Sequence, residues 1–292
     1  MTCIHVVTVH WMDDRWIEPQ LRYLERYLGE HKVWAALNGI DFDRYAGRFH
    51  HADDFEAPHP VKLNRLAELA RAEAGPDDLF LFLDGDAFPI APIDRDLLDG
   101  FPLAAMRRDE NMGEPQPHPA FCLVPVDFWF SIDGDWRQGY TWIASNGVET
   151  TDGGGNLLGI LRERGIEWRP LVRSNRYDLD PLWFGVYGDV VYHHGAGFRP
   201  PVSMLAGLAG KKSVRDAVAA AIIPESVPLL GRLERSLRYR AARRRAGVAI
   251  DEYADRSQAL SDEVFAWIEH EPDFVRRFTD PDAYAAERGG VR

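Results

Sequence analysis

A run of five apolar residues that leads into two carboxylates constrains this chain more than any other feature. Residues 79–83 read Leu-Phe-Leu-Phe-Leu, and Asp84 and Asp86 follow at once, separated by Gly85. An uninterrupted apolar run of this length predicts a strand buried on both faces, which is typical of a parallel sheet covered by helices. The sequence therefore predicts an α/β fold with the two acids at the end of a central strand.

The position of Asp84 and Asp86 indicates a ligand site. Open α/β sheets bind their ligands outside the carboxyl ends of the strands, and Gly85 lets a ligand approach the backbone. Two neighbouring carboxylates favour a hard divalent cation, Mn²⁺ or Mg²⁺, whose remaining positions are commonly filled by substrate phosphates. Because Asp and Gly are also common in ordinary turns, the metal hypothesis depends on the other motifs of the chain.

Apolar periodicity elsewhere predicts alternating strands and helices followed by a helical region. The expected strands are residues 4–9, 32–37, 79–83, 103–106, 120–125, 168–172 and 189–192. The expected helices are residues 16–28, 60–74, 155–164, 214–223, 229–245 and 257–269. This order predicts a Rossmann-like, mixed and mainly parallel sheet flanked by helices over residues 1–205, and a C-terminal helical extension over residues 206–292.

The charge of the chain is unevenly distributed. The formal net charge is -12 over 292 residues, which argues against general binding to nucleic acid. Residues 211–247 nevertheless contain ten basic and three acidic residues, with arginines flanking leucines. This segment could lie peripherally on the inner face of an anionic membrane, or it could pack against the acidic main domain.

Cysteine content and apolar run length bear on the compartment. The two cysteines, Cys3 and Cys122, lie in apolar surroundings and do not make a disulfide framework, and so few cysteines are typical of a reducing compartment. No apolar run approaches about 18 residues, and the N-terminal residues lack the pattern of a secretion signal. These features predict a cytoplasmic protein.

A segment rich in His and Gly offers further ligands. Residues 192–201 read Tyr-His-His-Gly-Ala-Gly-Phe-Arg-Pro-Pro and begin at the end of a predicted short strand. His193 or His194 can complete a carboxylate-rich metal shell, and the glycines let backbone amides approach a diphosphate that Arg199 neutralises. A surface turn with two solvated histidines is the alternative.

A second glycine-rich turn opens the helix predicted over residues 155–164. Residues 150–158 read Thr-Thr-Asp-Gly-Gly-Gly-Asn-Leu-Leu. Asp152 and Asn156 can hydrogen-bond hydroxyl groups, and amides at a helix start favour oxygen-rich or anionic groups. Asp152 is equally suited to a simple helix cap.

The order of these motifs resembles the GT-A fold glycosyltransferases that use nucleotide-sugar donors. Within that fold the chain is most similar to the branch that contains glycogenin and the bacterial lipopolysaccharide glucosyl- and galactosyltransferases. That branch combines Asp-X-Asp with a late His-X-X-Gly-X-X-Lys-Pro element. Four residues approximate this element, one residue short and with Arg for Lys: His194, Gly197, Arg199 and Pro200. Asp152 and Asn156 loosely match an intermediate turn of the family, and the resemblance spans residues 3–201.

The resemblance implies a metal-dependent hexosyltransferase. Its expected donor is a nucleotide-diphosphate sugar, foremost a uridine diphosphate sugar, and its acceptor is a hydroxyl group of a glycan, glycolipid or small molecule. The expected ligands of Mn²⁺ or Mg²⁺ are Asp84, Asp86, and His194 or His193. The residues expected to contact the nucleotide or diphosphate are His10, Trp11, Asp13, Lys62 and Arg199. The residues expected to contact the sugar or the acceptor are Asp152 and Asn156.

The reaction course and the activity itself each have alternatives. The family branch implies retention at the anomeric carbon without a dedicated base, whereas an inverting displacement would use Asp152 or Glu149 to deprotonate the acceptor. A haloacid-dehalogenase-like phosphatase also carries Asp-X-Asp after a buried strand, but its pattern requires Thr or Val where this chain has Phe88. A non-catalytic sugar- or nucleotide-binding module on the same scaffold is the third interpretation.

Overall fold

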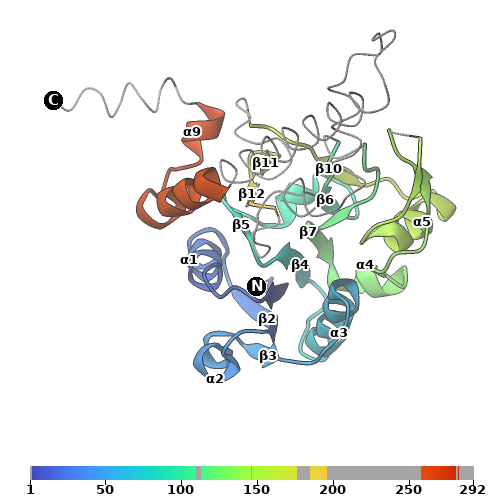
Figure 1. The fold of residues 1–292 in the computed structure, drawn as a ribbon. Helices are drawn as coiled ribbons and strands as arrows, with labels where there is room; N and C mark the ends of the chain where they lie inside the picture. Colours follow the sequence, from blue (N-terminus) through green and yellow to red (C-terminus); the bar gives the residue numbers. More distant parts are fainter. Residues whose placement is uncertain are drawn as a thin grey trace, which may run out of the picture. The chain divides into compact units, whose positions relative to one another are not determined.

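The computed structural model describes residues 2–109, 113–145, 147–175, 185–195, 258–280 and 282 (Figure 1). The strands are β1 (Ile4–Trp11), β2 (His31–Asn38), β3 (His51–Asp53), β4 (Leu79–Asp84), β5 (Ala87–Pro89), β6 (Ala104–Met106), β7 (His118–Pro125), β8 (Trp142–Ile143), β9 (Glu149–Thr150), β10 (Arg169–Leu171), β11 (Gly185–Tyr187) and β12 (Val191–His193). The helices are α1 (Ile17–Tyr27), α2 (Phe42–Tyr45), α3 (His59–Arg71), α4 (Val126–Ser131), α5 (Gly155–Glu163) and α9 (Arg276–Thr279), with short 3-10 helices at Ala46–Arg48 and Arg95–Leu98.

The central sheet has seven strands in the order β10-β6-β7-β4-β1-β2-β3. β1 pairs in parallel with β2 and with β4, whereas β7 is antiparallel to both of its neighbours, β4 and β6. The predicted α/β architecture, a mixed and mainly parallel sheet flanked by helices, is confirmed. Because β1, β2 and β4 run in the same direction, their carboxyl ends meet at one edge of the sheet, where Asp84 pairs in register with Val9.

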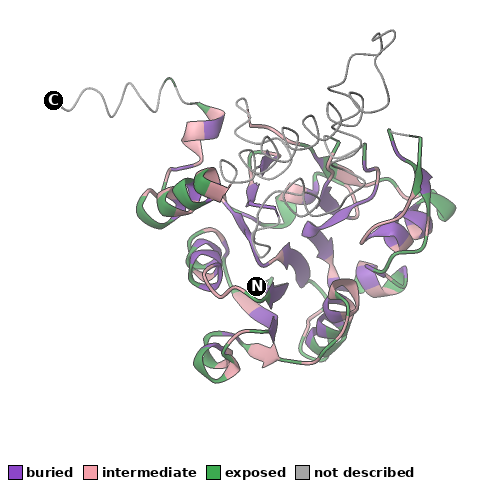
Figure 2. Ribbon diagram, viewed as in Figure 1, coloured by how far each residue is buried: buried purple, intermediate pink, exposed green. Residues whose placement is uncertain are grey.

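The two faces of the sheet carry separate apolar layers. On β4, three leucines belong to the layer that contains α1 side chains, and two phenylalanines belong to the layer that contains α3 side chains. These five side chains are fully buried, and Figure 2 shows the central strands largely in purple, the colour of buried residues. Alternate side chains of a strand point to opposite faces, so coverage of both faces requires the unbroken apolar run seen in the sequence.

A smaller antiparallel sheet, in the order β11-β12-β5, begins directly after the Asp84 turn. Residues 273–279 pack against it through aromatic rings. The ring centroid of Phe274 lies 5.1 Å from that of Tyr192 on β12 and 6.2 Å from that of Phe88 on β5. Phe274 is fully buried. This C-terminal strap, residues 273–279, therefore holds β5 and β12 from the same side.

The chain divides into two compact units. The first comprises Met1–Gly195 together with Asp273–Arg292, and the second comprises Ala196–Pro272. The sequence boundary near residue 205 assigns all of residues 206–292 to one extension, whereas in the structure the C-terminal strap belongs to the first unit.

Part of the predicted extension can be compared with the structure. Residues 258–270 are helical, which agrees with the helix predicted over residues 257–269. The helices predicted over residues 214–223 and 229–245, and with them the basic segment 211–247, lie outside the described residues.

The predicted strands and helices of the first unit agree with the structure to within a few residues. The strand predicted over residues 120–125 starts earlier, at His118, and the helix predicted over residues 60–74 ends at Arg71. Eight strands and α-helices among the described residues were not predicted, because segments of two to six residues carry too little periodicity to be recognised: β3, β5, β8, β9, β11, α2, α4 and α9.

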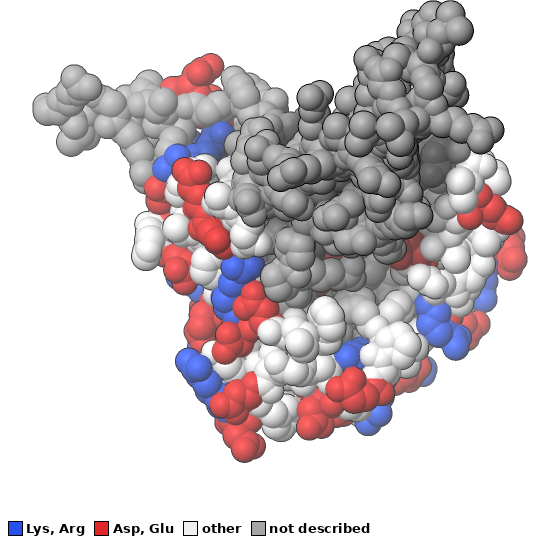
Figure 3. Space-filling model, in the orientation of Figure 1, with Lys and Arg blue, Asp and Glu red and all other residues white. Residues whose placement is uncertain are grey.

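The surface of the described residues mixes both signs of charge. On the face shown in Figure 3, acidic and basic side chains are interspersed over the described elements. Within the part of the chain that the structure describes, no helix has the length and apolar character needed to cross a lipid bilayer.

Phe274→Ala is expected to lower the free energy of unfolding by about 3–5 kcal/mol, because it removes a fully buried ring and leaves a cavity between the C-terminal strap and the strands β5 and β12. Urea denaturation monitored by circular dichroism measures this change. Ile143→Ala, which truncates a side chain that is 69% exposed, is the matched control and should change stability by less than about 0.5 kcal/mol. A Phe274→Ala variant as stable as the control would show that the C-terminal strap does not pack on the sheet.

Candidate functional site

The two carboxylates lie on either side of a tight turn at the end of β4. Asp84 is the last residue of β4, and Asp86 follows in the turn with 3% of its surface exposed. The Gln20 side chain, which comes from α1, fastens this turn because its amide nitrogen donates to the carbonyl oxygens of Asp84 and Ala87, both at 2.8 Å. Sequence reasoning missed Gln20, since nothing in its local pattern marks it as more than a helix residue.

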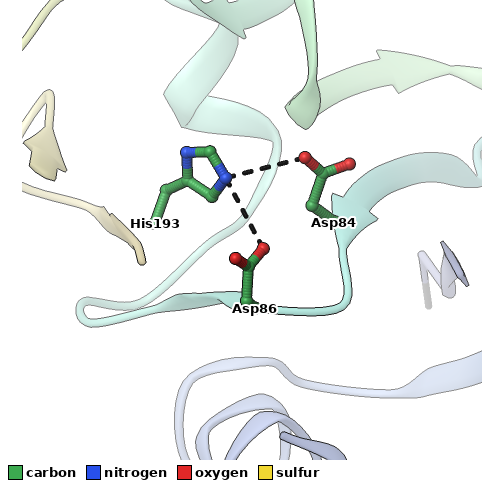
Figure 4. Close-up of side chains that lie close together, drawn as sticks. All are labelled: Asp84, Asp86 and His193. Carbon is green, nitrogen blue, oxygen red and sulfur yellow. Dashed lines mark ion pairs between the residues drawn. The ribbon is translucent and has the colours of Figure 1, made fainter. Parts of the chain in front are cut away.

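His193 completes a three-residue cluster with the carboxylates (Figure 4). Its Nε2 lies 3.6 Å from Oδ2 of Asp84 and 3.5 Å from Oδ1 of Asp86. The pairing of β12 with β5 produces this approach, because it places His193 opposite Ala87, one residue after Asp86. The three side chains come from β4, the following turn and β12, and they point toward one another.

The side chain of His194 lies apart from this cluster, although its backbone amide donates to the carbonyl oxygen of Asp86 at 3.0 Å. Its ring is fully buried, 4.6 Å from the Trp16 ring between centroids, and its Nδ1 is hydrogen-bonded to the Tyr192 hydroxyl at 2.8 Å. Burial lowers the pKa of His194 to about 3, so its imidazole is neutral. Adjacent residues of an extended segment point to opposite sides, and of the two histidines predicted as alternative ligands, the structure brings His193 to the carboxylates.

A further histidine, which sequence reasoning missed, approaches Asp84 from the first turn of α3. Nε2 of His59 lies 3.3 Å from Oδ1 of Asp84. That oxygen is buried and accepts no hydrogen bond from any described residue. A buried carboxylate oxygen without a donor is costly unless a cation or another donor reaches it.

The donor set suits a divalent cation. The ligand atoms of Asp84, Asp86 and His193 lie within 4.8 Å of one another. Carboxylate oxygens together with one imidazole nitrogen fit Mn²⁺ or Mg²⁺ better than a soft metal. Oδ1 of Asp84, which is in ion-pair contact with His59 but accepts no hydrogen bond from a described residue, adds a position for positive charge. The residues present therefore fit the cation that the sequence predicts.

The end of β1 presents two exposed apolar side chains beside this edge of the sheet. Trp11 is 46% exposed and Met12 is 61% exposed. Met12 has φ 66°, an uncommon value for a residue other than glycine. It packs against Gly39 at the end of β2, where an added Cβ would lie 2.6 Å from the Met12 sulfur. Asp13, predicted with Trp11 as a nucleotide contact, is ion-paired with Arg15 at 2.7 Å.

His10 and Lys62, two other predicted donor contacts, are buried. His10 donates from Nε2 to Oε1 of Gln20 at 3.1 Å, and burial lowers its pKa to about 4. The Lys62 ammonium donates to Oδ1 of Asn38 at the end of β2, and burial lowers its pKa as well. His10 thus supports Gln20 beneath the Asp84 turn, whereas Lys62 binds the end of the neighbouring strand.

The candidate residues Asp152 and Asn156 of the second glycine-rich turn, and Glu149 just before it, have separate surroundings. Asp152 accepts a hydrogen bond from the amide of Gly153 at 2.8 Å and lies 3.6 Å from Nη2 of Arg108. Asn156 donates to Asp135 at 2.7 Å. Glu149 on β9 is exposed and accepts a hydrogen bond from the Thr141 hydroxyl at 2.7 Å.

Asn156 belongs to a network around Asp135. The Asp135 carboxylate accepts hydrogen bonds from Asn64, Arg137 and Asn156, and these donors lower its pKa to about 2. The side-chain amide of Asn156 therefore stabilises the contact between α5 and the loop before β8. Arg199, the remaining predicted donor contact, lies outside the described residues.

Comparisons with known proteins add little to this geometry. No family model and no curated protein matches the chain. Two solved structures of the glycosyltransferase GlyE of Streptococcus pneumoniae TIGR4 are similar to it. One is 18% identical over 45% of this chain and 36% of its own, with a TM-score of 0.30. The apo form is 15% identical over 88% of this chain and 64% of its own, with a TM-score of 0.36. The chain thus spans less than two thirds of either structure, and likeness at this level assigns no activity to it.

The buried His10 is expected to make stability depend on pH. Its pKa is about 4 in the folded protein and about 6.5 when exposed, so below pH 6.5 the unfolded chain binds the proton first and the free energy of unfolding falls until about pH 4. His10→Gln should remove a loss on the order of 2 kcal/mol between pH 7 and pH 5. Urea titrations at both pH values measure it. His31→Gln on β2 is the control, and equal pH slopes in wild type and His10→Gln would contradict the assignment.

Proposed function

We propose that this protein is a metal-dependent glycosyltransferase. It moves a sugar from a nucleotide-diphosphate donor, foremost a uridine diphosphate sugar, to a hydroxyl acceptor on a glycan, glycolipid or small molecule. The observation that carries the proposal is the convergence of Asp84, Asp86 and His193 at the carboxyl end of β4, next to the exposed Trp11 at the end of β1. The resemblance of the sequence motifs to GT-A fold enzymes supports the same assignment.

The cluster has the chemistry that this reaction needs. Negative charge grows on the diphosphate as the bond to the sugar breaks, and Mn²⁺ or Mg²⁺, when bound, stabilises that charge. Asp84, Asp86 and His193 would hold the cation. Gln20 keeps the backbone of the Asp84 turn in place, because its side-chain amide donates hydrogen bonds to the carbonyl oxygens of Asp84 and Ala87. His59, whose Nε2 lies 3.3 Å from Oδ1 of Asp84, adds an imidazole on the α3 side of the cluster.

The donor nucleotide is expected at the end of β1. Trp11 has the exposure needed to stack on a nucleobase, and Asp13 lies in the same loop. Lys62 and Arg199 are the proposed partners of the diphosphate. Asp152 and Asn156 are the proposed contacts to hydroxyl groups of the sugar or of the acceptor, and Asn156 also belongs to the Asp135 network.

The two possible stereochemical courses of the reaction differ in whether they need a general base. Retention, expected from the family branch, needs none, whereas an inverting displacement would draw on Asp152 or Glu149. The anomeric configuration of the product, read by proton NMR, distinguishes the two. We further propose a cytoplasmic location, with residues 211–247 as a peripheral contact to the inner face of the membrane.

Asp86→Asn is expected to weaken binding of uridine diphosphate in the presence of Mn²⁺ at least tenfold and to abolish slow hydrolysis of the cognate nucleotide sugar. The amide keeps the size of the carboxylate but loses the charge that binds the cation. Calorimetry and thermal shift measure binding, because a ligand selective for the folded state raises apparent stability. Asp133→Asn, which changes an 88% exposed side chain, is the control.

Two outcomes of the same assays favour the rival interpretations. Release of phosphate from simple phosphomonoesters, lost in Asp84→Asn, would indicate a phosphatase. Binding of a nucleotide sugar by the wild type without turnover across a panel of acceptors would indicate a non-catalytic module.

Trp11→Ala is expected to reduce affinity for uridine diphosphate about tenfold or more, because stacking of a base on an aromatic ring contributes about 1–3 kcal/mol. The ring is 46% exposed, so the fold should be retained. Calorimetry with Mn²⁺ measures the affinity, and Ile143→Ala, another exposed apolar truncation, is the control. Unchanged affinity in Trp11→Ala would place the base elsewhere.

A further inference from the structure

A second cluster of polar side chains lies beside the first. Ligand atoms of Glu114, His118 and Asp152 come within 4.8 Å of one another. The cluster joins the start of β7 to the turn that precedes α5. It is adjacent to the first cluster, because the His118 and His193 rings are 6.2 Å apart between centroids.

Arg108 decides what kind of ligand this second cluster can take. Its Nη2 lies 2.8 Å from Oε2 of Glu114 and 3.6 Å from Oδ2 of Asp152. A cation held by these two carboxylates would meet the guanidinium charge at close range, so the cluster is a poor second metal site. An anionic ligand is equally disfavoured, because both carboxylates face the same space as the arginine.

His118 adds a neutral donor of fixed direction. The amide of Ala120 donates to its Nδ1 at 3.1 Å, which makes Nδ1 the acceptor. A ring nitrogen that accepts a hydrogen bond carries no proton, so the proton of the His118 ring is on Nε2, which can donate to a ligand.

Gln116 points independently to a missing partner. Its side chain is fully buried, and its Nε2 lies 3.4 Å from Oε2 of Glu114. Its Oε1 accepts no hydrogen bond from any described residue. A buried acceptor of this kind requires a donor such as a hydroxyl or an ordered water.

The backbone fixes Asp152 against this group. Gly154 has φ +91°, and a Cβ at this position would lie 2.3 Å from the carbonyl oxygen of Pro117. Only glycine permits this contact, which brings the Asp152 turn directly onto the segment that carries Gln116 and His118. The backbone therefore holds the donors Arg108 and His118 close to the acceptors Glu114 and Asp152.

We propose that Arg108, Glu114, His118 and Asp152 form a subsite for the vicinal hydroxyl groups of the donor sugar. A hydroxyl both donates and accepts, so it satisfies a carboxylate and the His118 Nε2 proton at once, which neither a phosphate nor an aliphatic group does. The inference rests on the proposed function and assigns the sugar-recognising side chains within it. The subsite selects for a polyhydroxylated group next to the diphosphate.

The test compares ligands with and without the sugar. Uridine diphosphate, UDP-glucose, UDP-galactose and UDP-N-acetylglucosamine are titrated with Mn²⁺ into wild type, Asp152→Asn, His118→Phe and the control Asp133→Asn. We expect the wild type to bind at least one UDP-sugar more tightly than uridine diphosphate. Asp152→Asn and His118→Phe should each weaken the binding of that UDP-sugar about tenfold, which corresponds to the loss of one hydrogen bond to a charged or buried group. The affinity for uridine diphosphate should not change. Circular dichroism melting verifies folding.

Three results would overturn the inference. Equal affinity of the wild type for uridine diphosphate and all three UDP-sugars would show that no sugar subsite exists, and the proposed function would then stand or fall on turnover alone. If the variants lose affinity for uridine diphosphate and for the UDP-sugar equally, the cluster acts only by supporting the metal site. Failure of the wild type to bind any of the four ligands would overturn the proposed donor and the subsite together.

Discussion

Two carboxylates in one turn at the edge of a buried sheet require positive charge nearby, and this requirement organises the rest of the site. Asp86 is almost fully buried, and one oxygen of Asp84 is buried without a hydrogen-bond donor among the described residues. Like charges this close destabilise each other in a low dielectric unless cations or donors compensate them. His193 and His59 approach the pair from opposite segments of the chain, and a divalent cation would complete the compensation.

The charged turn connects the two sheets. Asp84 is the last residue of β4 in the central sheet, and β5 of the smaller sheet starts directly after Asp86. Gln20 fastens the backbone of this turn from α1, and pairing of β5 with β12 delivers His193. The C-terminal strap packs Phe274 on both of these short strands, so residues nearly 190 positions after the turn take part in holding it.

The polar groups around the turn fall into neighbouring zones with different chemistry. The end of β1 offers an exposed aromatic surface at Trp11, the turn offers carboxylates for a cation, and the cluster around Arg108 alternates hydrogen-bond donors and acceptors. A nucleotide-diphosphate sugar has a base, a diphosphate and a polyhydroxylated ring in that same order. This correspondence is why the proposed function and the proposed sugar subsite support each other.

The sequence by itself determined β4, the parallel sheet and the position of Asp84, because a strand buried on both faces needs an unbroken apolar run that any reader of the chain can find. Only the tertiary structure shows that His193, and not the side chain of His194, lies beside the carboxylates, because this depends on the register in which β12 pairs with β5. His59 and His118 could not be predicted as site residues from the sequence for a related reason. Each belongs to an ordinary helix or strand start, and only packing of distant segments brings His59 to Asp84 and His118 to Asp152 and His193.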